Sequence, residues 1–496
     1  MTATGYTLGV DIGTFESKGV LVDGAGRIVA QAARPHEMLV PRPGWAEHRP
    51  EEDWWGDFVH ITRKLLTGID PAEVKAVACS AIGPCMLPLD GAGNPLMNGV
   101  LYGVDTRASA EIALLNEALG EAVILERCGN ALTSQSVGPK ILWLKRNHPD
   151  LWAQTSKVVT ATTFLTLRLT GECVIDHYTA ANFSPLYDIT RQDWCPDFGD
   201  ICGLDRLPRL MWSNEIAGEV TARAAAETGL APGTPVTCGT IDAAAEAVSV
   251  GVTAPGDMMM MYGSTIFIIE VTAQRLKDAR LWHAPWLYPG QHAAMAGLAT
   301  SGTLTHWLRD HFARDLPRET AFATLTEEAM ASPPGAKGLI CLPYFSGERT
   351  PIHDPLAKGA FFGLNLTHTR GDLYRAALEG IASAARHITD TYAEGGAAPR
   401  RVLAVGGGTK NRPWLQATSD LTGLDQVVAR VTVGASFGDA WLAARALGSA
   451  ARIEEWNPPE QVIEATAHAA YARQYPLFRR LYEQTKDIAA ELSDAP

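Results

Sequence analysis

Apolar residues in the first half of the chain form short runs that alternate with segments of helical spacing. Short runs bounded by glycine or polar turns predict strands, and recurrence every three or four positions predicts helices. The predicted strands are residues 6–11, 18–23 and 74–78, and the helical segments are 51–66, 143–149 and 164–171. This alternation is typical of α/β proteins.

The second half of the chain begins the pattern again. A second hairpin is predicted from the strands 258–262 and 266–271 and the tip Gly263-Ser264-Thr265. Gly263 lies 250 positions after Gly13, and Met261 takes the place of Asp11, so only the first hairpin has the carboxylate. A weak repeat of this kind predicts two domains of similar topology that face each other. The other elements predicted here are a helix over 372–387, a strand over 401–405, a helix from about 413 and a tail helix over 470–492.

Two predicted helices are built almost wholly of small residues. The first begins at Asp242, after a short apolar strand and a turn at Gly239, and the second covers residues 434–447. Helices without bulky side chains can pack closely, so we expect this pair at a crossing point between the domains.

Asp242 has two interpretations at this stage. Unpaired backbone N–H groups and the helix dipole stabilise a carboxylate at a helix start. Because Asp is among the preferred N-cap residues, capping alone would explain it. The alternative, a functional carboxylate, depends on the rest of the chain.

Length and composition restrict the class of protein. The chain has 496 residues, 46% of them hydrophobic, which favours two domains with ample cores. A net charge of −13 argues against a nucleic-acid partner. The eight cysteines are dispersed without metal-ligand spacing, which indicates reduced thiols. No signal peptide or membrane span is expected, since residues 1–9 lack a basic region and the apolar run 258–269 is short. We therefore expect a cytoplasmic protein.

Candidate chemistry begins in the first hairpin. Asp11, Gly13 and Thr14 offer a carboxylate, a hydroxyl and unhindered N–H groups together, as a magnesium–phosphate site requires. The alternative is an ordinary hairpin tip, since Gly and Thr are common there. Asp105 and Arg107 follow another predicted strand, where α/β proteins bind ligands, so they are candidate hydroxyl binders. A surface ion pair is the alternative for these two.

A glycine-rich turn follows the strand at 401–405. Asn411 stands where a dinucleotide fingerprint would have glycine, which argues against that fingerprint. The turn, residues 406–411, would still allow backbone to lie flat against an adenine ring. The Pro- and Gly-rich segment 342–363 is predicted to be an ordered loop.

With these motifs in place, the chain resembles the FGGY carbohydrate kinases of the actin/hexokinase/Hsp70 superfamily, nearly from end to end. The motifs that carry the resemblance are Gly359-Ala360-Phe361-Phe362-Gly363-Leu364, Asp372 to Gly380 and Gly347-Glu348-Arg349-Thr350-Pro351. The resemblance implies an α/β fold of two ribonuclease H-like (actin-like ATPase) domains with an active-site cleft between them. It implies an N-terminal domain over residues 1–250 for sugar and magnesium–phosphate, and a C-terminal domain over 251–496 for nucleotide, with the last helix as a candidate to pack back across the cleft.

The resemblance also implies roles for individual residues. Asp242 would be the base that accepts the proton of the sugar hydroxyl, and Asp11 would hold magnesium. The nucleotide would be bound by Gly13, Thr14, Ser264, Thr265, Gly302, Gly407, Gly408 and Asn411. The sugar would be met by Gly83, Pro84, Asp105, Arg107 and Asp242. ATP and Mg²⁺ are the implied cofactors and a small-molecule sugar the implied partner, with neither nucleic acid nor membrane; a homodimer is left open.

The sequence departs from the family pattern in the sugar pocket. Ala243 follows the expected base where the family often has Asn or Gln, and Gly83-Pro84 replaces the Met-His of xylulose kinases. A missing hydrogen bond to a hydroxyl matters greatly for discrimination between substrates. Xylulose, other pentuloses, sugar acids and polyols all remain open as substrates, and so does the hydroxyl that is phosphorylated.

Two other functions remain compatible with this fold. An actin- or Hsp70-like ATPase would share both hairpins, but would not need Asp242 or the loop at 347–351. A catalytically inactive sugar sensor would fit the altered pocket. The presence of both Asp11 and Asp242 argues against the sensor.

Overall fold

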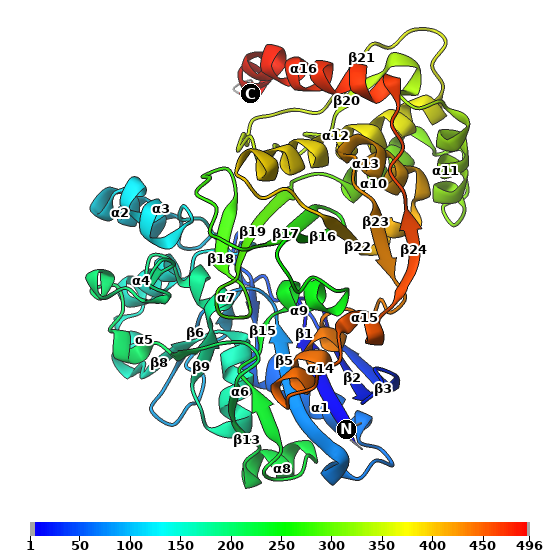
Figure 1. Cartoon of the computed structure of the whole chain (residues 1–496). Coiled ribbons are helices and arrows are strands. Elements are labelled where there is room, and N and C mark those ends of the chain that lie inside the picture. The colour runs from blue at the N-terminus through cyan, green and yellow to red at the C-terminus, as the bar shows by residue number, and fades with distance from the viewer. Residues whose placement is uncertain (1–4, 494–496) are drawn as a thin grey trace.

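Two mixed β-sheets, each organised around a β-hairpin, form the framework of the molecule (Figure 1). The computed structural model describes residues 5–493. Residues 1–4 and 494–496, which the predicted domain limits include, lie outside the described residues.

The first sheet has the order β13-β14-β5-β1-β2-β3, and β15 also pairs with β5. Strand β1 is antiparallel to β2 and parallel to β5. Its strands are β1 (Tyr6–Ile12), β2 (Glu16–Asp23), β3 (Ile28–Pro35), β5 (Val74–Ala81), β13 (Ile216–Glu219), β14 (Pro235–Thr237) and β15 (Thr240–Ile241).

The second sheet has the order β18-β19-β17-β16-β22-β23-β24. Its strands are β16 (Asp257–Tyr262), β17 (Ile266–Thr272), β18 (Trp282–Pro285), β19 (His292–Leu298), β22 (Arg401–Val405), β23 (Gln426–Ala429) and β24 (Pro459–Ile463). Strand β16 is antiparallel to β17 and parallel to β22, as β1 is to β2 and β5. The predicted repeat of topology between the two halves is therefore confirmed.

Helices and short strands surround the first sheet. They are β4 (Glu47–His48), η1 (Pro50–Trp55), α1 (Gly56–Leu65), β6 (Leu87–Leu89), β7 (Gly99–Val100), α2 (Ser109–Leu119), α3 (Glu121–Cys128), α4 (Val137–Asn147), α5 (Pro149–Gln154), β8 (Lys157–Val159), α6 (Ala161–Thr170), β9 (Val174–Asp176), α7 (His177–Ala180), β10 (Tyr187–Asp188), β11 (Asp193–Trp194), β12 (Arg209–Met211), α8 (Ala222–Thr228) and α9 (Asp242–Ser249).

The helices of the second domain lie around the second sheet and a small hairpin. These elements are α10 (Gly302–Phe312), α11 (Ala321–Ala331), β20 (Ile340–Leu342), β21 (Ala360–Phe362), α12 (Arg370–Glu394), α13 (Arg412–Thr422), α15 (Ile453–Trp456) and α16 (Ala469–Ser493). Helix α16 packs against α12, α13 and β20, so the last helix stays with the second domain.

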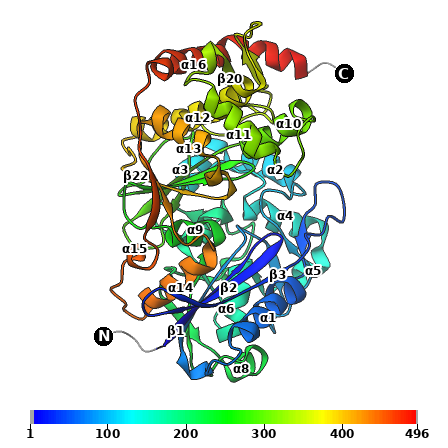
Figure 2. The same cartoon turned by 90° about the vertical axis from the view of Figure 1, so that its right-hand side faces the viewer.

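Helix α14 (Ala435–Ala446) crosses to the first domain instead. It packs on β1, β5 and α9, among the N-terminal strands in both views (Figures 1 and 2). A Cβ atom on Gly438 would lie 2.0 Å from the carbonyl oxygen of Ala245, and one on Gly9 would lie 1.9 Å from that of Ser436. The absence of side chains at these glycines allows the expected crossing of α9 and α14. Helix α14 therefore packs on the first sheet although it follows residue 250 in the chain.

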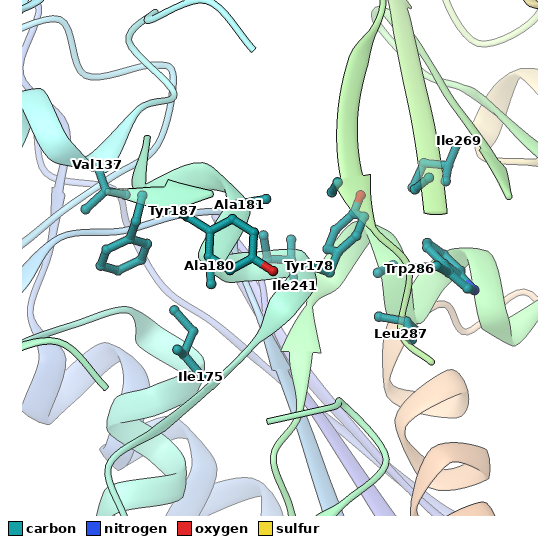
Figure 3. Close-up of a cluster of buried hydrophobic side chains, with 14 of the residues drawn as sticks. Val137, Ile175, Tyr178, Ala180, Ala181, Tyr187, Ile241, Ile269, Trp286 and Leu287 are labelled. Atoms are coloured by element: carbon teal, nitrogen blue, oxygen red, sulfur yellow. The ribbon is translucent and has the colours of Figure 1, made fainter. Parts of the chain in front are cut away.

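The two domains share a hydrophobic core beneath the crossing. Tyr178 and Ile241 come from the first domain, and Ile269 and Trp286 come from the second (Figure 3). The rings of Tyr178 and Trp286 meet edge to face at 5.6 Å. Apolar side chains therefore join the two domains directly.

Candidate active site

Asp11 lies near the end of β1, where the first hairpin meets the neighbouring strand. The hydroxyl of Ser80 lies 2.9 Å from Asp11 Oδ1 and 2.7 Å from Asp439 Oδ2. Burial raises the pKa of Asp11 to about 6, against the hydrogen bond of Ser80 and the positive charge of Lys18. Asp439 is fully buried, and burial raises its pKa well above the usual range.

The tip of the first hairpin presents free backbone donors. Gly13 N–H donates to the carbonyl of Glu16 at 3.2 Å. The N–H groups of Thr14 and Phe15, by contrast, have no acceptor among residues 5–493. Adjacent free N–H groups of this kind form a concavity that binds anions.

The second hairpin ends in a similar tip, against the beginning of α10. The N–H groups of Ser301 and Thr303 donate to the carbonyl of Ser264 at 3.2 and 3.1 Å, and Gly302 N–H donates to that of Gly263 at 3.0 Å. A Cβ on Gly302 would lie 2.4 Å from the Gly263 oxygen, so glycine is needed for this approach. The N–H groups of Ser264 and Thr265 have no acceptor within the described chain.

Asp242 is the first residue of α9, and Ile241 occupies the N-cap position. Asp242 Oδ1 accepts a hydrogen bond from the N–H of Ala243 at 2.7 Å. The carboxylate is therefore not an N-cap. Burial and the negative charge of Asp11 raise the pKa of Asp242 well above the usual range, against the Ala243 hydrogen bond.

A fourth carboxylate, Glu246, adds to this negative region. Burial and the charge of Asp11 raise the pKa of Glu246 to about 7, while Lys18 lowers it. Uncompensated buried carboxylates favour a cation nearby. Within residues 5–493, however, no group of three or more His, Cys, Asp or Glu side chains is placed to hold a metal ion.

A cavity of about 260 Å³ opens at Asp242 between the two domains. First-domain residues of its lining are Gly83, Pro84, Tyr102, Asn130, Ala131, Thr133, Gln135, Ser136, Tyr178, Ala181, Asn182, Ser184, Ile241, Asp242 and Ala243. The second domain adds Phe267, Trp282, His283, Ala284 and Met295. Asn130 joins the two sets, because its side chain accepts the N–H of His283 and donates to the carbonyl of His283, both at 2.8 Å.

Asp105 and Arg107 lie outside this lining, which corrects their expected place in the sugar pocket. Both side chains are fully buried, and Arg107 forms ion pairs with Asp105 and Glu47, each at 2.8 Å. Arg107 also lies over the ring of Trp45, at 4.0 Å from its centroid. The alternative prediction, an ion pair at the surface, is also wrong, because the ion pair between Arg107 and Asp105 is buried. Tyr102, from the same loop, lines the cavity instead.

The residues expected around adenosine differ in their surroundings. A Cβ on Gly407 would meet no atom within 4 Å, whereas one on Gly408 would lie 2.7 Å from the Trp414 ring. Asn411 caps α13 through the N–H of Trp414 at 3.2 Å and donates to the hydroxyl of Tyr374 at 3.3 Å. Of the two glycines, Gly407 has room for an added side chain and Gly408 does not.

Several cavity residues had no signal in the sequence. Asn130, Tyr178, Asn182, Trp282 and His283 belong to loops, a short helix and an edge strand that are far apart along the chain. None belongs to a motif, and their proximity depends on how the domains pack.

No helix in the described part of the chain is long and apolar enough to cross a membrane. The cytoplasmic location and the homodimer stay predictions.

Two family models match most of the chain. The N-terminal domain of the FGGY family of carbohydrate kinases matches residues 6–249, and the C-terminal domain of the same family matches residues 258–447.

Individual proteins match over almost their whole length. The chain is 27% identical to a xylulose kinase of Bacillus subtilis strain 168, with 98% of each chain covered. It is 29% identical to a xylulose kinase of Escherichia coli strain K12, over 97% of this chain and 100% of the other. The crystal structure of xylulose kinase from Rhodospirillum rubrum superposes with a TM-score of 0.92 at 32% identity, covering 98% and 99% of the two chains.

Proposed function

The chain belongs to the FGGY family of carbohydrate kinases and is a sugar kinase, and from this premise we propose that it phosphorylates an uncharged sugar or polyol with Asp242 as general base. ATP is the co-substrate expected for the family. The observation that carries the proposal is the position of Asp242, which lines the interdomain cavity and lies close enough to Asp11 to feel its negative charge.

In the proposed mechanism, Asp242 accepts the proton of the substrate hydroxyl as that oxygen attacks phosphorus. Phosphoryl transfer has a loose transition state, so the base has to be ionised and aligned rather than strong. The hydrogen bond from Ala243 N–H holds Oδ1, and leaves the other carboxylate oxygen for the substrate.

The residues present fit a magnesium–nucleotide group. Free N–H groups at both hairpin tips suit phosphate, the open face of Gly407 suits a flat ring, and Asp11 would hold the metal. When bound, ATP would supply the phosphoryl group, and Mg²⁺ would supply a positive charge to offset the repulsion between Asp11 and Asp242. Asp11, with Ser80 hydrogen-bonded to it, would keep its orientation throughout.

Gly407→Val should raise the KM for ATP about tenfold or more and leave the KM for the sugar unchanged. A Cβ at this position would meet no atom of residues 5–493 within 4 Å, so the added side chain is directed at the space where a ligand would lie. Steady-state kinetics with each substrate varied in turn would measure both constants. Gly408→Val is a poorer test, because its side chain would displace Trp414 whether or not nucleotide binds. Equal changes in both constants for Gly407→Val would contradict the assignment.

The cavity is suited to an uncharged substrate. No lysine or arginine is among its lining residues, and its polar side chains apart from Asp242 are neutral hydroxyls, amides and aromatic groups. Burial lowers the pKa of His283, which keeps that ring neutral as well. A substrate carboxylate would therefore find no lysine or arginine side chain among these lining residues to pair with, and would add to the negative charge around Asp242. Like charges brought together in this way cost several kcal/mol.

Xylitol should be phosphorylated with a kcat/KM about a hundredfold or more above that of xylonate, which differs from it by one terminal carboxylate. ADP release over matched ketoses, polyols and aldonates would measure this preference. Within the neutral group, D-xylulose should be a mediocre substrate, since Gly83, Pro84 and Ala243 offer no polar side chain. A preference for the acid would refute the neutral pocket. Sugar-independent turnover would favour the ATPase alternative, and silence with every sugar would favour the sensor.

A further inference from the structure

We propose that His36 and His48 are positioning residues for nucleotide phosphate, and that they turn the free N–H groups of the first hairpin tip toward the ligand while His36 carries a positive charge. This inference rests on the proposed role of that hairpin as a phosphate site.

Both histidines lie directly behind the hairpin tip. His36 Nε2 is 3.1 Å from the carbonyl oxygen of Gly13, and His48 Nε2 is 3.1 Å from that of Thr14. The two rings meet edge to face at 4.8 Å. Both are shielded from solvent, since 4% of the His36 side chain and none of His48 is exposed.

These hydrogen bonds set the orientation of two peptide planes. In a trans peptide the N–H points opposite to the C=O. With the carbonyls of Gly13 and Thr14 directed at the histidines, the N–H groups of Thr14 and Phe15 are directed away from them. Those are the two groups of the tip that have no acceptor in residues 5–493.

The second hairpin has the same arrangement with different donors. There the carbonyls of Gly263 and Ser264 accept N–H groups from the beginning of α10, and the next N–H groups along the chain are free. In the first hairpin, His36 and His48 donate to the corresponding carbonyls. Different donors thus direct the free N–H groups away from the same side at both tips. This agreement indicates that the direction of the N–H groups is important for the site.

The hydrogen bonds of His36 require a proton on each ring nitrogen. Nε2 faces a carbonyl, and Nδ1 is 2.8 Å from Oδ2 of Asp57, so both partners are acceptors. Arg34 Nε pairs with Oδ1 of Asp57 at 3.0 Å, and the Ser17 hydroxyl donates to Oδ2 at 2.7 Å. Burial opposes the charge, but the hydrogen bond to Asp57 and the charges of Asp57 and Asp53 raise the pKa of His36 above its usual value.

His48 is neutral, by contrast. Trp54 Nε1–H donates to His48 Nδ1 at 3.1 Å, which makes Nδ1 an acceptor and places the proton on Nε2. Burial and the charge of His36 lower the pKa of His48 to about 4. The pair therefore supplies two fixed donors and one positive charge behind the phosphate site.

The charge can be tested by the pH dependence of MgADP binding, measured by calorimetry without sugar. The imidazolium is present below the raised pKa of His36 and is lost as the pH rises through it, so affinity should fall about three- to tenfold across that pKa. His36→Gln should bind more weakly at about pH 6 and show no such fall. Asp57→Asn should move the fall to lower pH. A wild-type affinity that is independent of pH, or the same fall in His36→Gln, would overturn the charged role.

The orientation can be tested by exchanging donors at position 48. His48→Leu removes the donor to Thr14 and should raise the Kd for MgADP about tenfold, while His48→Gln retains an amide N–H and should recover most of the affinity. His60→Gln, an exposed histidine on α1, is the control and should bind like the wild type. Equal losses in His48→Leu and His48→Gln would contradict the donor role.

A further measurement needs no variant. Side-chain nitrogen NMR of the ligand-free protein should show His36 protonated at both ring nitrogens up to a higher pH than exposed His60, and His48 protonated at Nε2 alone; any other pattern refutes the inference. If the wild type binds MgADP but the variants match it, the inference fails and the proposed function stands. If the wild type does not bind MgADP, both fail.

Discussion

Asp242→Asn should reduce sugar-dependent turnover by roughly two to four orders of magnitude, the usual contribution of a positioned general base. The amide has nearly the same shape and its oxygen can still accept the N–H of Ala243, so the start of α9 should be unchanged. It cannot accept the proton of the substrate hydroxyl. MgADP affinity should persist, since the proposed phosphate contacts lie on the hairpins.

The stability of this variant separates catalysis from a structural role. Removing a buried carboxylate that is repelled by Asp11 should leave the free energy of unfolding unchanged or slightly higher. Glu246→Gln makes the same chemical change one helical turn away, outside the cavity lining, and should cost much less turnover. A folded Asp242→Asn enzyme with near wild-type turnover would refute the proposed mechanism.

Gly438→Ala should destabilise the protein by about 3 kcal/mol, with a lower melting temperature and reduced turnover. In an uncrowded helix the same change would stabilise by roughly 1 kcal/mol, because alanine is the better helix former. Here the new methyl group would lie 2.0 Å from the carbonyl oxygen of Ala245, and backbone has to move to relieve the contact. Since α9 begins with Asp242, its displacement also misplaces the base.

Thermal unfolding of Gly438→Ala and of Gly91→Ala would measure this effect. A Cβ on Gly91 would meet no atom within 4 Å, so the control should melt close to the wild type. If Gly438→Ala melts at or above the wild-type temperature, the crossing of α9 and α14 is not as tight as the structure places it.

Local pattern identified the repeated framework of this protein well. The predicted strand at 401–405 is β22, and the small-residue helix predicted over 434–447 is α14 to within one residue at each end. Gly406 follows the strand and Gly434 precedes the helix, and glycine is a strong signal for the end of an element. Helix α12 was predicted over 372–387 but covers Arg370–Glu394. Its capping box places Thr369 before the first turn, and its C-terminal extension lies in the packed core of the second domain.

The positions of charged residues in the sequence did not predict which side chains line the cavity. Asp105 and Arg107 are residue types that often bind polar ligands, but here they form a buried ion pair with each other. Whether an ionic side chain binds a ligand or another residue depends on which partner is nearer, and the order of residues does not contain that distance.

The sequence by itself determined the two hairpins, their glycine tips, the helix start at Asp242 and the small residues at the crossing, because each depends on neighbours a few positions away. Only the tertiary structure decided that α14 packs on the first sheet, that Ser80 lies between Asp11 and Asp439, and that two histidines contact the first hairpin. The physical reason for these hydrogen bonds is the burial of polar groups. A buried polar group loses its hydrogen bonds to water, so it has to find a partner within the protein, wherever along the chain that partner lies.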